Sequence, residues 1–220
     1  MNIMAAHLKG AEGAESRAFP LYFHEKFAIM NGEEMRRQGG YPMDTDGKLI
    51  WEMIQYYDRD PKRVGHFLKV YGYAKAIGEA EALSPQLQQI LETAAIVHDI
   101  GIRASLKKHK SSAGPYQERE GPPLAKAMLE KLKYPPELIG RVCYLVGHHH
   151  TYTNISGLDY QILVEADFLV NMEEDGMELD AIRSIGEKIF CTDRGKAILR
   201  ELYLKEERKN GSRGSKKTSE

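Results

Sequence analysis

Apolar residues recur along most of the chain at the three- and four-residue spacing of an amphipathic helix. This spacing predicts helices over 61–78, 84–100, 122–133, 137–149, 159–173, 178–190 and 193–206. Two of the helices follow Asp60-Pro61 and Ser84-Pro85, where a capping side chain precedes a proline. Residues 102–121 are predicted to form a loop because serine, glycine and proline cluster at their centre. Alternating strand patterns are missing, so we expect an all-α protein.

The two ends of the chain are expected to lie outside the helical core. Residues 1–16 are small and polar and are predicted to be flexible. Residues 17–58 are predicted to form one or two helices, with a loop near Gly39-Gly40, that pack on the main bundle. Residues 205–220 carry six basic and three acidic side chains and are predicted to be a disordered basic tail, with a nucleic-acid arm as the alternative. We therefore expect one domain over 17–204, with its motifs in 60–173.

The charge balance limits the classes of partner. The 220 residues include 31 Lys and Arg against 32 Asp and Glu, and the formal net charge is −1. Because this balance lacks the basic excess of proteins that bind nucleic acid by bulk electrostatics, such binding is not expected. No apolar run reaches the roughly 18 residues of a membrane span, and the N-terminus lacks the build of a secretory signal. Two cysteines, Cys143 and Cys191, cannot form a disulfide framework. We expect a cytoplasmic protein.

Four polar residues fall where the helical pattern points toward the core. His66 lies on the inward side of the 61–78 helix, and His98 extends the apolar stripe of 84–100 by one turn. Asp99 follows directly, and Asp167 lies inside the apolar run 162–170. A buried ionised carboxylate is costly unless a positive group neutralises it. Each residue alone could be an ordinary hydrogen-bonded core group, but a shared cation accounts for all four together.

The order of these residues resembles that of the HD-domain superfamily of metal-dependent phosphohydrolases. A histidine on one helix is followed by a His-Asp pair at the end of an Ala-rich apolar helix, and later by an aspartate on a third helix. The resemblance covers about residues 60 to 170, roughly half of the chain. It implies an all-α orthogonal helical bundle of the HD-domain type with about eight to ten helices. The residues that carry it are 63–66, 94–101, 145–149 and 165–167.

The resemblance implies that His66, His98, Asp99 and Asp167 bind one divalent metal ion. Two imidazoles and two carboxylates form a mixed nitrogen–oxygen donor set, which suits Mn, Fe, Co or Ni better than Mg or a closed structural Zn site. A metal-bound water that loses its proton near neutral pH would attack phosphorus. Asp99 is the expected catalytic residue, with one oxygen on the metal and the other holding or deprotonating that water.

The run His148-His149-His150 is the second candidate feature. Helical periodicity favours His149 as the most inward, the family pattern starts the pair at His148, and His150 is the least favoured. In the family this pair binds a second metal or contacts the substrate phosphate. Two-metal families carry a further histidine before the helix that is predicted to begin near Gly121, where this chain has 116–118, Tyr-Gln-Glu. We therefore expect one metal, with His148 and His149 as catalytic residues facing the substrate. A second metal bound by the pair, or a surface position for it, are the alternatives.

Basic residues near these motifs are candidate contacts for a phosphate group. Arg63 lies one turn before His66, where a guanidinium could bind phosphate bidentately. Arg103 and Lys107 follow the His-Asp pair in the predicted loop 102–121 and could cover an anionic substrate. Each could equally be a solvated or ion-paired surface residue.

The leading hypothesis is a metal-dependent phosphohydrolase that cleaves a phosphomonoester of a small molecule or a nucleotide. Its expected partner is a small phosphorylated substrate, without membrane or nucleic acid, and a homodimer is left open. The alternatives are a di-iron oxygenase of the same superfamily, which needs two metals, and a non-catalytic module that senses a nucleotide or a metal. His7, His24 and His109 have no predicted role.

Overall fold

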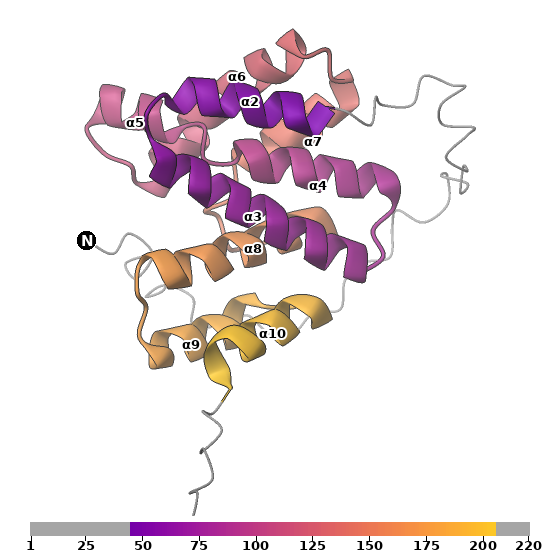
Figure 1. Cartoon of the computed structure of the whole chain (residues 1–220), viewed down its shortest axis with the longest axis vertical. Helices are drawn as coiled ribbons and strands as arrows, with labels where there is room; N and C mark the ends of the chain where they lie inside the picture. Colours follow the sequence, from indigo (N-terminus) through magenta and orange to yellow (C-terminus); the bar gives the residue numbers. More distant parts are fainter. Residues whose placement is uncertain (1–44, 206–220) are drawn as a thin grey trace, which may run out of the picture.

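Helices make up the fold that a computed structural model describes for residues 45–205 (Figure 1). Within this range there is no β-strand, and the prediction of an all-α protein is confirmed. The elements are α2 (Thr45–Tyr57), α3 (Pro61–Ala80), α4 (Pro85–Val97), α5 (Ile102–His109), α6 (Gly114–Lys131), α7 (Pro136–Val146), α8 (Leu158–Glu174), α9 (Leu179–Ile189), α10 (Asp193–Leu199) and a π-helical turn, η2 (Arg200–Leu204).

Two predicted helix starts have the expected caps. The Asp60 carboxylate accepts a hydrogen bond from the backbone N–H of Arg63 at 3.0 Å, and the Ser84 hydroxyl accepts one from the N–H of Leu87 at 3.3 Å. Each cap satisfies an N–H group that the helix leaves unpaired. At its other end α4 stops at Val97, so that residues 98–101 form a turn instead of the last turn of the predicted helix 84–100.

The predicted loop over 102–121 is wrong. Residues 102–109 form α5, which ends where Lys110 adopts a left-handed conformation with φ of 55°. The helix predicted to start at 122 already begins at Gly114, with a proline in its first turn and two more inside it. Tertiary packing supports the helix at its glycine and prolines, because α6 lies so close to α7 that a Cβ atom on Gly121 would be 2.7 Å from the Val146 side chain. The close contact of α6 with α7 therefore outweighs the low helix propensity of glycine and proline.

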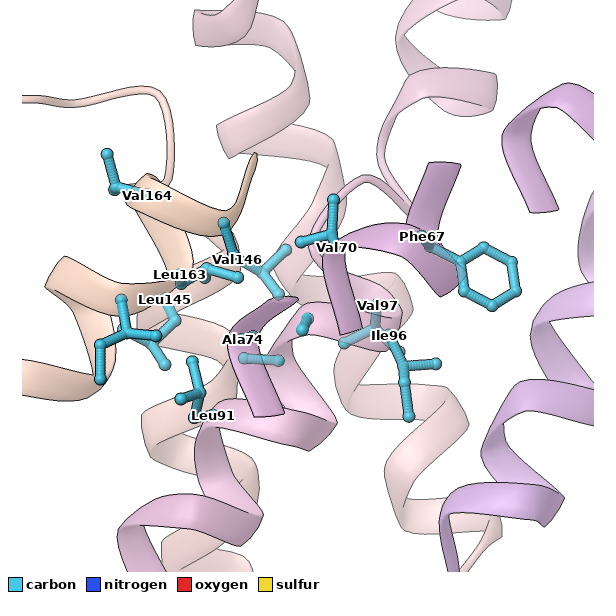
Figure 2. Packing of buried hydrophobic residues seen from close by; sticks show 14 of the residues in the cluster. Phe67, Val70, Ala74, Leu91, Ile96, Val97, Leu145, Val146, Leu163 and Val164 are labelled. Carbon is cyan, nitrogen blue, oxygen red and sulfur yellow. The ribbon is translucent and has the colours of Figure 1, made fainter. Parts of the chain in front are cut away.

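Helix α8 lies at the centre of the hydrophobic core. Thirteen of its 17 residues are buried, and it packs against α3, α4, α9 and α10. Figure 1 shows α8 between α3 on one side and α9 and α10 on the other. Apolar side chains of α3, α4, α7 and α8 meet in this core, among them Val70, Leu91, Val146 and Leu163 (Figure 2). A polar side chain that α8 directs into this region is therefore shielded from water.

Several predictions about the ends concern residues that the structure does not describe. The flexible segment 1–16, the loop near Gly39-Gly40 and the tail beyond residue 205 lie outside the described range. Of the segment 17–58, the described part forms α2, which packs against α3, α4 and α6. Among the described helices, none is long and apolar enough to cross a lipid bilayer.

Candidate metal centre

Three parts of the fold bring the four predicted residues to one place. His66 comes from α3, His98 and Asp99 from the turn after α4, and Asp167 from α8. The His66 Nε2 atom lies 3.3 Å from His98 Nε2 and 3.3 Å from Asp167 Oδ1. Asp99 Oδ2 lies 3.5 Å from His66 Nε2 and 3.7 Å from His98 Nε2. All four side chains are buried, so that two nitrogens and two carboxylates meet away from bulk water.

The backbone sets the orientation of two imidazole rings. His98 donates from Nδ1 to the Ala95 carbonyl oxygen at 2.8 Å, and His149 donates from Nδ1 to the Val146 carbonyl oxygen at 2.9 Å. A carbonyl oxygen only accepts hydrogen bonds, so these contacts place the ring proton on Nδ1. When either ring is neutral, its Nε2 atom carries a lone pair that points into the cluster.

A second layer of side chains holds the other two candidate ligands, His66 and Asp167. Glu174 accepts a hydrogen bond from His66 Nδ1 at 3.1 Å, and its other oxygen lies 2.9 Å from Lys69 Nζ. The Asn171 amide donates to Asp167 Oδ1 at 2.8 Å and to the Asp167 carbonyl oxygen at 2.9 Å. Such partners fix the rotamers of groups that bind metals. The sequence pattern did not indicate Asn171 or Glu174, although they lie four and seven positions after Asp167 on the same face of α8.

The charges of the cluster favour a positive group at its centre. Burial by itself would lower the pKa of His66, but the hydrogen bond to Asp167 and the charges of Asp99 and Glu174 raise it to about 9. Burial would raise the pKa values of Asp99 and Asp167, but the facing imidazoles, His98 among them, hold both pKa values well below their usual range. Both carboxylates are therefore ionised at neutral pH.

The donor set fits a divalent cation. With Nδ1 of His98 committed to a backbone carbonyl and Nδ1 of His66 to a carboxylate, two Nε2 atoms face each other at 3.3 Å. Two bare nitrogen lone pairs at this distance repel unless a proton or a cation lies between them. The Nε2 atoms of His66 and His98 and an oxygen of Asp167 all lie within 4.8 Å of one another, which is close enough to share one ion. Imidazoles with carboxylates suit transition metals with open water positions.

A second group of candidate ligands adjoins the first. Asp99, His149 and His150 have potential ligand atoms within 4.8 Å of one another, and Asp99 Oδ1 lies 3.3 Å from His149 Nε2. The buried Nε2 atom of His150 has no hydrogen-bond partner among the described residues. Burial and the nearby charge of His149 lower the pKa of His150 to about 3, so that this ring is neutral. The two oxygens of Asp99 thus face two different groups of imidazoles.

The structure changes the assignment of the three consecutive histidines. His149 is buried, as its periodicity predicts. His148 lies outside both groups, with Nδ1 2.7 Å from the Tyr144 carbonyl oxygen and its ring stacked on Tyr144. The prediction that His150 is the least favoured of the three is wrong, because His150 and not His148 joins a group of candidate ligands. The physical reason is that α7 ends at Val146, so that helical periodicity no longer describes the direction of the side chains that follow.

Two other helices hold the turn that carries these histidines. Glu118 of α6 accepts hydrogen bonds from the His150 backbone N–H at 3.1 Å and from the Thr151 hydroxyl at 2.9 Å. The Tyr160 hydroxyl of α8 lies against the carbonyl oxygens of His148 and Thr151. Sequence analysis noted Glu118 only as a departure from two-metal families, and its role here depends on the packing of α6.

The three predicted phosphate contacts lie in different surroundings. The Arg103 guanidinium donates to the Tyr56 carbonyl oxygen and lies 5.7 Å from the centre of the Tyr56 ring, so it is tied to α2. Lys107 is exposed on α5, in a helix instead of the predicted loop. Arg63 is half-buried, and its charge acts on Tyr57, which contacts the backbone of Asp99.

The comparison with protein families agrees with this geometry. The family model described as HD domain matches residues 63–190, which are 128 of the 220 residues. The matched stretch includes all four clustered residues and the three consecutive histidines. The chain therefore belongs to the HD-domain family, and the resemblance seen in the sequence is confirmed. Neither the curated proteins nor the solved structures that were searched include a match to this chain.

Proposed function

We propose that this HD-domain protein is a metal-dependent phosphohydrolase that cleaves a phosphomonoester of a small molecule or a nucleotide. The observation that carries the proposal is the buried cluster of His66, His98, Asp99 and Asp167, in which two Nε2 atoms and two carboxylates face one point. Membership of a family composed mostly of metal-dependent phosphohydrolases supports the same reaction class. A cytoplasmic location stays a prediction.

His66, His98, Asp99 and Asp167 would hold the metal, and Mn, Fe, Co or Ni suits these donors best. When bound, such an ion supplies Lewis acidity that polarises a phosphoryl oxygen and lowers the pKa of a water molecule. Asp99 has one oxygen toward His66 and His98 and the other toward His149. It is therefore placed to orient a water molecule and to accept its proton, while His149 steadies the second oxygen.

Among the three predicted phosphate contacts we favour Arg63. It makes no ion pair with a described carboxylate, and its charge reaches Tyr57 beside the Asp99 backbone. A free guanidinium at this position can bind two oxygens of a phosphate group at once. Lys107 would add positive charge at the surface. We assign Arg103 a smaller part, because its guanidinium is already bound to α2.

A second candidate function follows from the second group of ligands. Asp99, His149 and His150 could hold another metal ion, whereas the sequence pattern placed that site at His148 and His149. Two metals would keep the di-iron oxygenase as an alternative. The ratio of metal to protein separates the functions, because one bound metal per chain would exclude the oxygenase. A non-catalytic sensor would bind phosphate compounds without turnover.

The decisive experiment is a phosphatase screen with nucleotides and sugar phosphates in the presence of Mn²⁺, Co²⁺, Ni²⁺ or Fe²⁺. We expect at least one substrate to be hydrolysed, and Asp99→Ala to lower the rate by a factor on the order of 100 or more. Asp180→Ala is the matched control, because this carboxylate is 96% exposed on α9. Absence of turnover with every metal, or equal turnover in Asp99→Ala and wild type, would refute the proposal.

Metal-dependent thermal stability tests the site without an activity measurement. A metal that binds only the folded chain raises the melting temperature. Replacing Asp167 by Asn removes a buried anionic donor and should shrink that rise for each of the four metals. If the wild-type protein melts at the same temperature with and without metal, the four residues are not a metal site.

A further inference from the structure

The carboxylate of Asp99 lacks a hydrogen-bond partner outside the cluster, which each of the other three candidate ligands has. Glu174 and a backbone carbonyl orient the two imidazoles, and an asparagine donates to Asp167. Among the described residues, the two carboxylate oxygens of Asp99 lie within hydrogen-bond or ion-pair distance only of imidazole nitrogens, which belong to His66, His98 and His149. The position of this carboxylate therefore depends on how firmly its backbone is held.

Two consecutive tyrosines at the end of α2 bind the backbone of the turn that carries Asp99. The Tyr57 hydroxyl donates to the Asp99 carbonyl oxygen at 2.6 Å, and the Tyr56 hydroxyl donates to the Ile100 carbonyl oxygen at 3.1 Å. The Asp99 carbonyl also accepts from the Ile102 N–H at 3.0 Å. These carbonyls follow the last residue of α4, where an α-helix leaves its acceptors without intrahelical partners.

Hydrogen bonds are donated from α2 to the turn and also from the residue after the turn to α2. Arg103, just after the turn, donates to the Tyr56 carbonyl oxygen at the end of α2. Tyr57 is only 4% exposed. Burial and the charge of Asp99 keep its pKa well above the usual value, so that the hydroxyl stays a donor. The last turn of α2 and residues 99–103 thus form one hydrogen-bonded unit.

The turn also lies against α6. A Cβ atom on Gly101 would be 2.6 Å from the Gln117 carbonyl oxygen and 2.9 Å from the Gly121 nitrogen, so the two backbones are already in close contact. The turn cannot move toward α6, and the Tyr57 hydroxyl restrains it on the α2 side. Removing that hydroxyl leaves the carbonyl oxygen of Asp99 with one hydrogen-bond donor, the Ile102 N–H, instead of two.

We infer that Tyr57 is a positioning residue of the candidate metal centre. Through the backbone of the turn, Tyr57 fixes the position of the Asp99 carboxylate relative to the three imidazoles of His66, His98 and His149. This inference rests on the proposed metal site. It assigns a role to α2, which ends before residue 63, where the match to the HD-domain family model begins.

The test compares Tyr57→Phe with Tyr71→Phe in the full-length chain. Tyr71 anchors α2 near its other end, because its hydroxyl lies 3.1 Å from Asp46 Oδ2 and 3.3 Å from Glu92 Oε2. Both variants lose one hydroxyl that binds α2 into the fold, but only Tyr57 contacts the turn. Mn²⁺ binding is measured by calorimetry well below both melting temperatures, and hydrogen exchange of the amides of 98–102 is measured without metal.

We expect Tyr57→Phe to weaken Mn²⁺ binding by about three- to tenfold, the effect of one lost hydrogen bond, and to speed exchange of the turn amides. Tyr71→Phe should lower the melting temperature and leave both measurements unchanged. The inference is overturned if Tyr57→Phe binds Mn²⁺ like wild type, or if Tyr71→Phe weakens binding equally. Wild-type protein that binds none of Mn²⁺, Co²⁺, Ni²⁺ and Fe²⁺ would refute the metal site itself, and the inference with it.

Discussion

Binding of a metal ion should displace a proton from His66, and the affinity for Mn²⁺ should therefore rise with pH. His66 has its pKa raised to about 9 because burial, which acts to lower it, is outweighed by Asp167, Asp99 and Glu174. At pH 7 this pKa leaves only about one ring in a hundred unprotonated. Since a metal ion needs the lone pair of Nε2, each binding event at neutral pH must release close to one proton.

The magnitude follows from the same pKa. Between pH 7 and about 9, the apparent dissociation constant for Mn²⁺ should fall by about tenfold per pH unit. Stability of the metal-free protein should change in the opposite direction. The pKa of His66 is 6.5 in the unfolded chain and about 9 in the fold, so the stability from its proton is fully present below pH 6.5. That stability, on the order of 3 kcal/mol, is lost as the pH rises toward 9.

The assay is calorimetric titration with Mn²⁺ at pH 7 in two buffers of different ionisation heat. The difference in observed heat counts the protons released, and we expect a value near one. Glu174→Gln removes a charge that faces His66 Nδ1 at 3.1 Å, so it should lower the pKa of His66 and, with it, the pH above which the dissociation constant stops falling. Glu173→Gln is the matched control, because this neighbouring side chain is 62% exposed and also pairs with Lys69, but it makes no contact with the His66 ring.

Two results would contradict this reasoning. A dissociation constant that does not change between pH 7 and 9, with no proton released at pH 7, would show that His66 is neutral in the metal-free fold. Equal effects of Glu174→Gln and Glu173→Gln would show that overall charge, and not contact with the ring, sets the pKa of His66.

Two further predictions concern stability. Gly101→Ala places a Cβ atom 2.6 Å from the Gln117 carbonyl oxygen and should lower the free energy of unfolding by about 1–3 kcal/mol. Gly72→Ala meets no atom within 4 Å and should raise the free energy of unfolding by about 0.5–1 kcal/mol, because alanine favours the helix α3. Thermal unfolding measures both, and a Gly72→Ala variant less stable than Gly101→Ala would contradict the packing described. The Lys108 ammonium and an imidazole lower the pKa of Glu120 from 4.5 to about 2. The contribution of this ionised carboxylate to the stability of the fold is therefore fully present above pH 4.5 and is lost as the pH falls toward 2. Between these pH values, the free energy of unfolding should depend less steeply on pH in Glu120→Gln than in the wild type. An equal dependence in both proteins would disprove the ion pair.

Local signals in the sequence were sufficient for most helices and for the core of the site. Asp60-Pro61 and Ser84-Pro85 cap and start helices through contacts within four residues, so no other part of the chain is needed to place them. His66 and Asp167 stood out because a polar group on an apolar helix face is costly to bury alone. The structure brings these two residues within 3.3 Å of each other.

Tertiary structure decided the features that depend on contacts between distant segments. The helix over part of 102–121 forms because Gly121 lets α6 approach α7, a contact that outweighs local propensity. His150, and not His148, joins Asp99 because the direction of a side chain in a turn follows from what holds the turn, here Glu118.

The role of Tyr57 could not be predicted from the sequence either. Its partner, the Asp99 carbonyl, lies 42 positions along the chain and carries no side-chain signal. The sequence alone determined which residue types have to be buried and the helix faces that bury them, because helix geometry relates residues three and four positions apart. Only the packed structure determined the second layer of hydrogen bonds around the site, because those bonds join backbone groups and side chains from helices far apart in the chain.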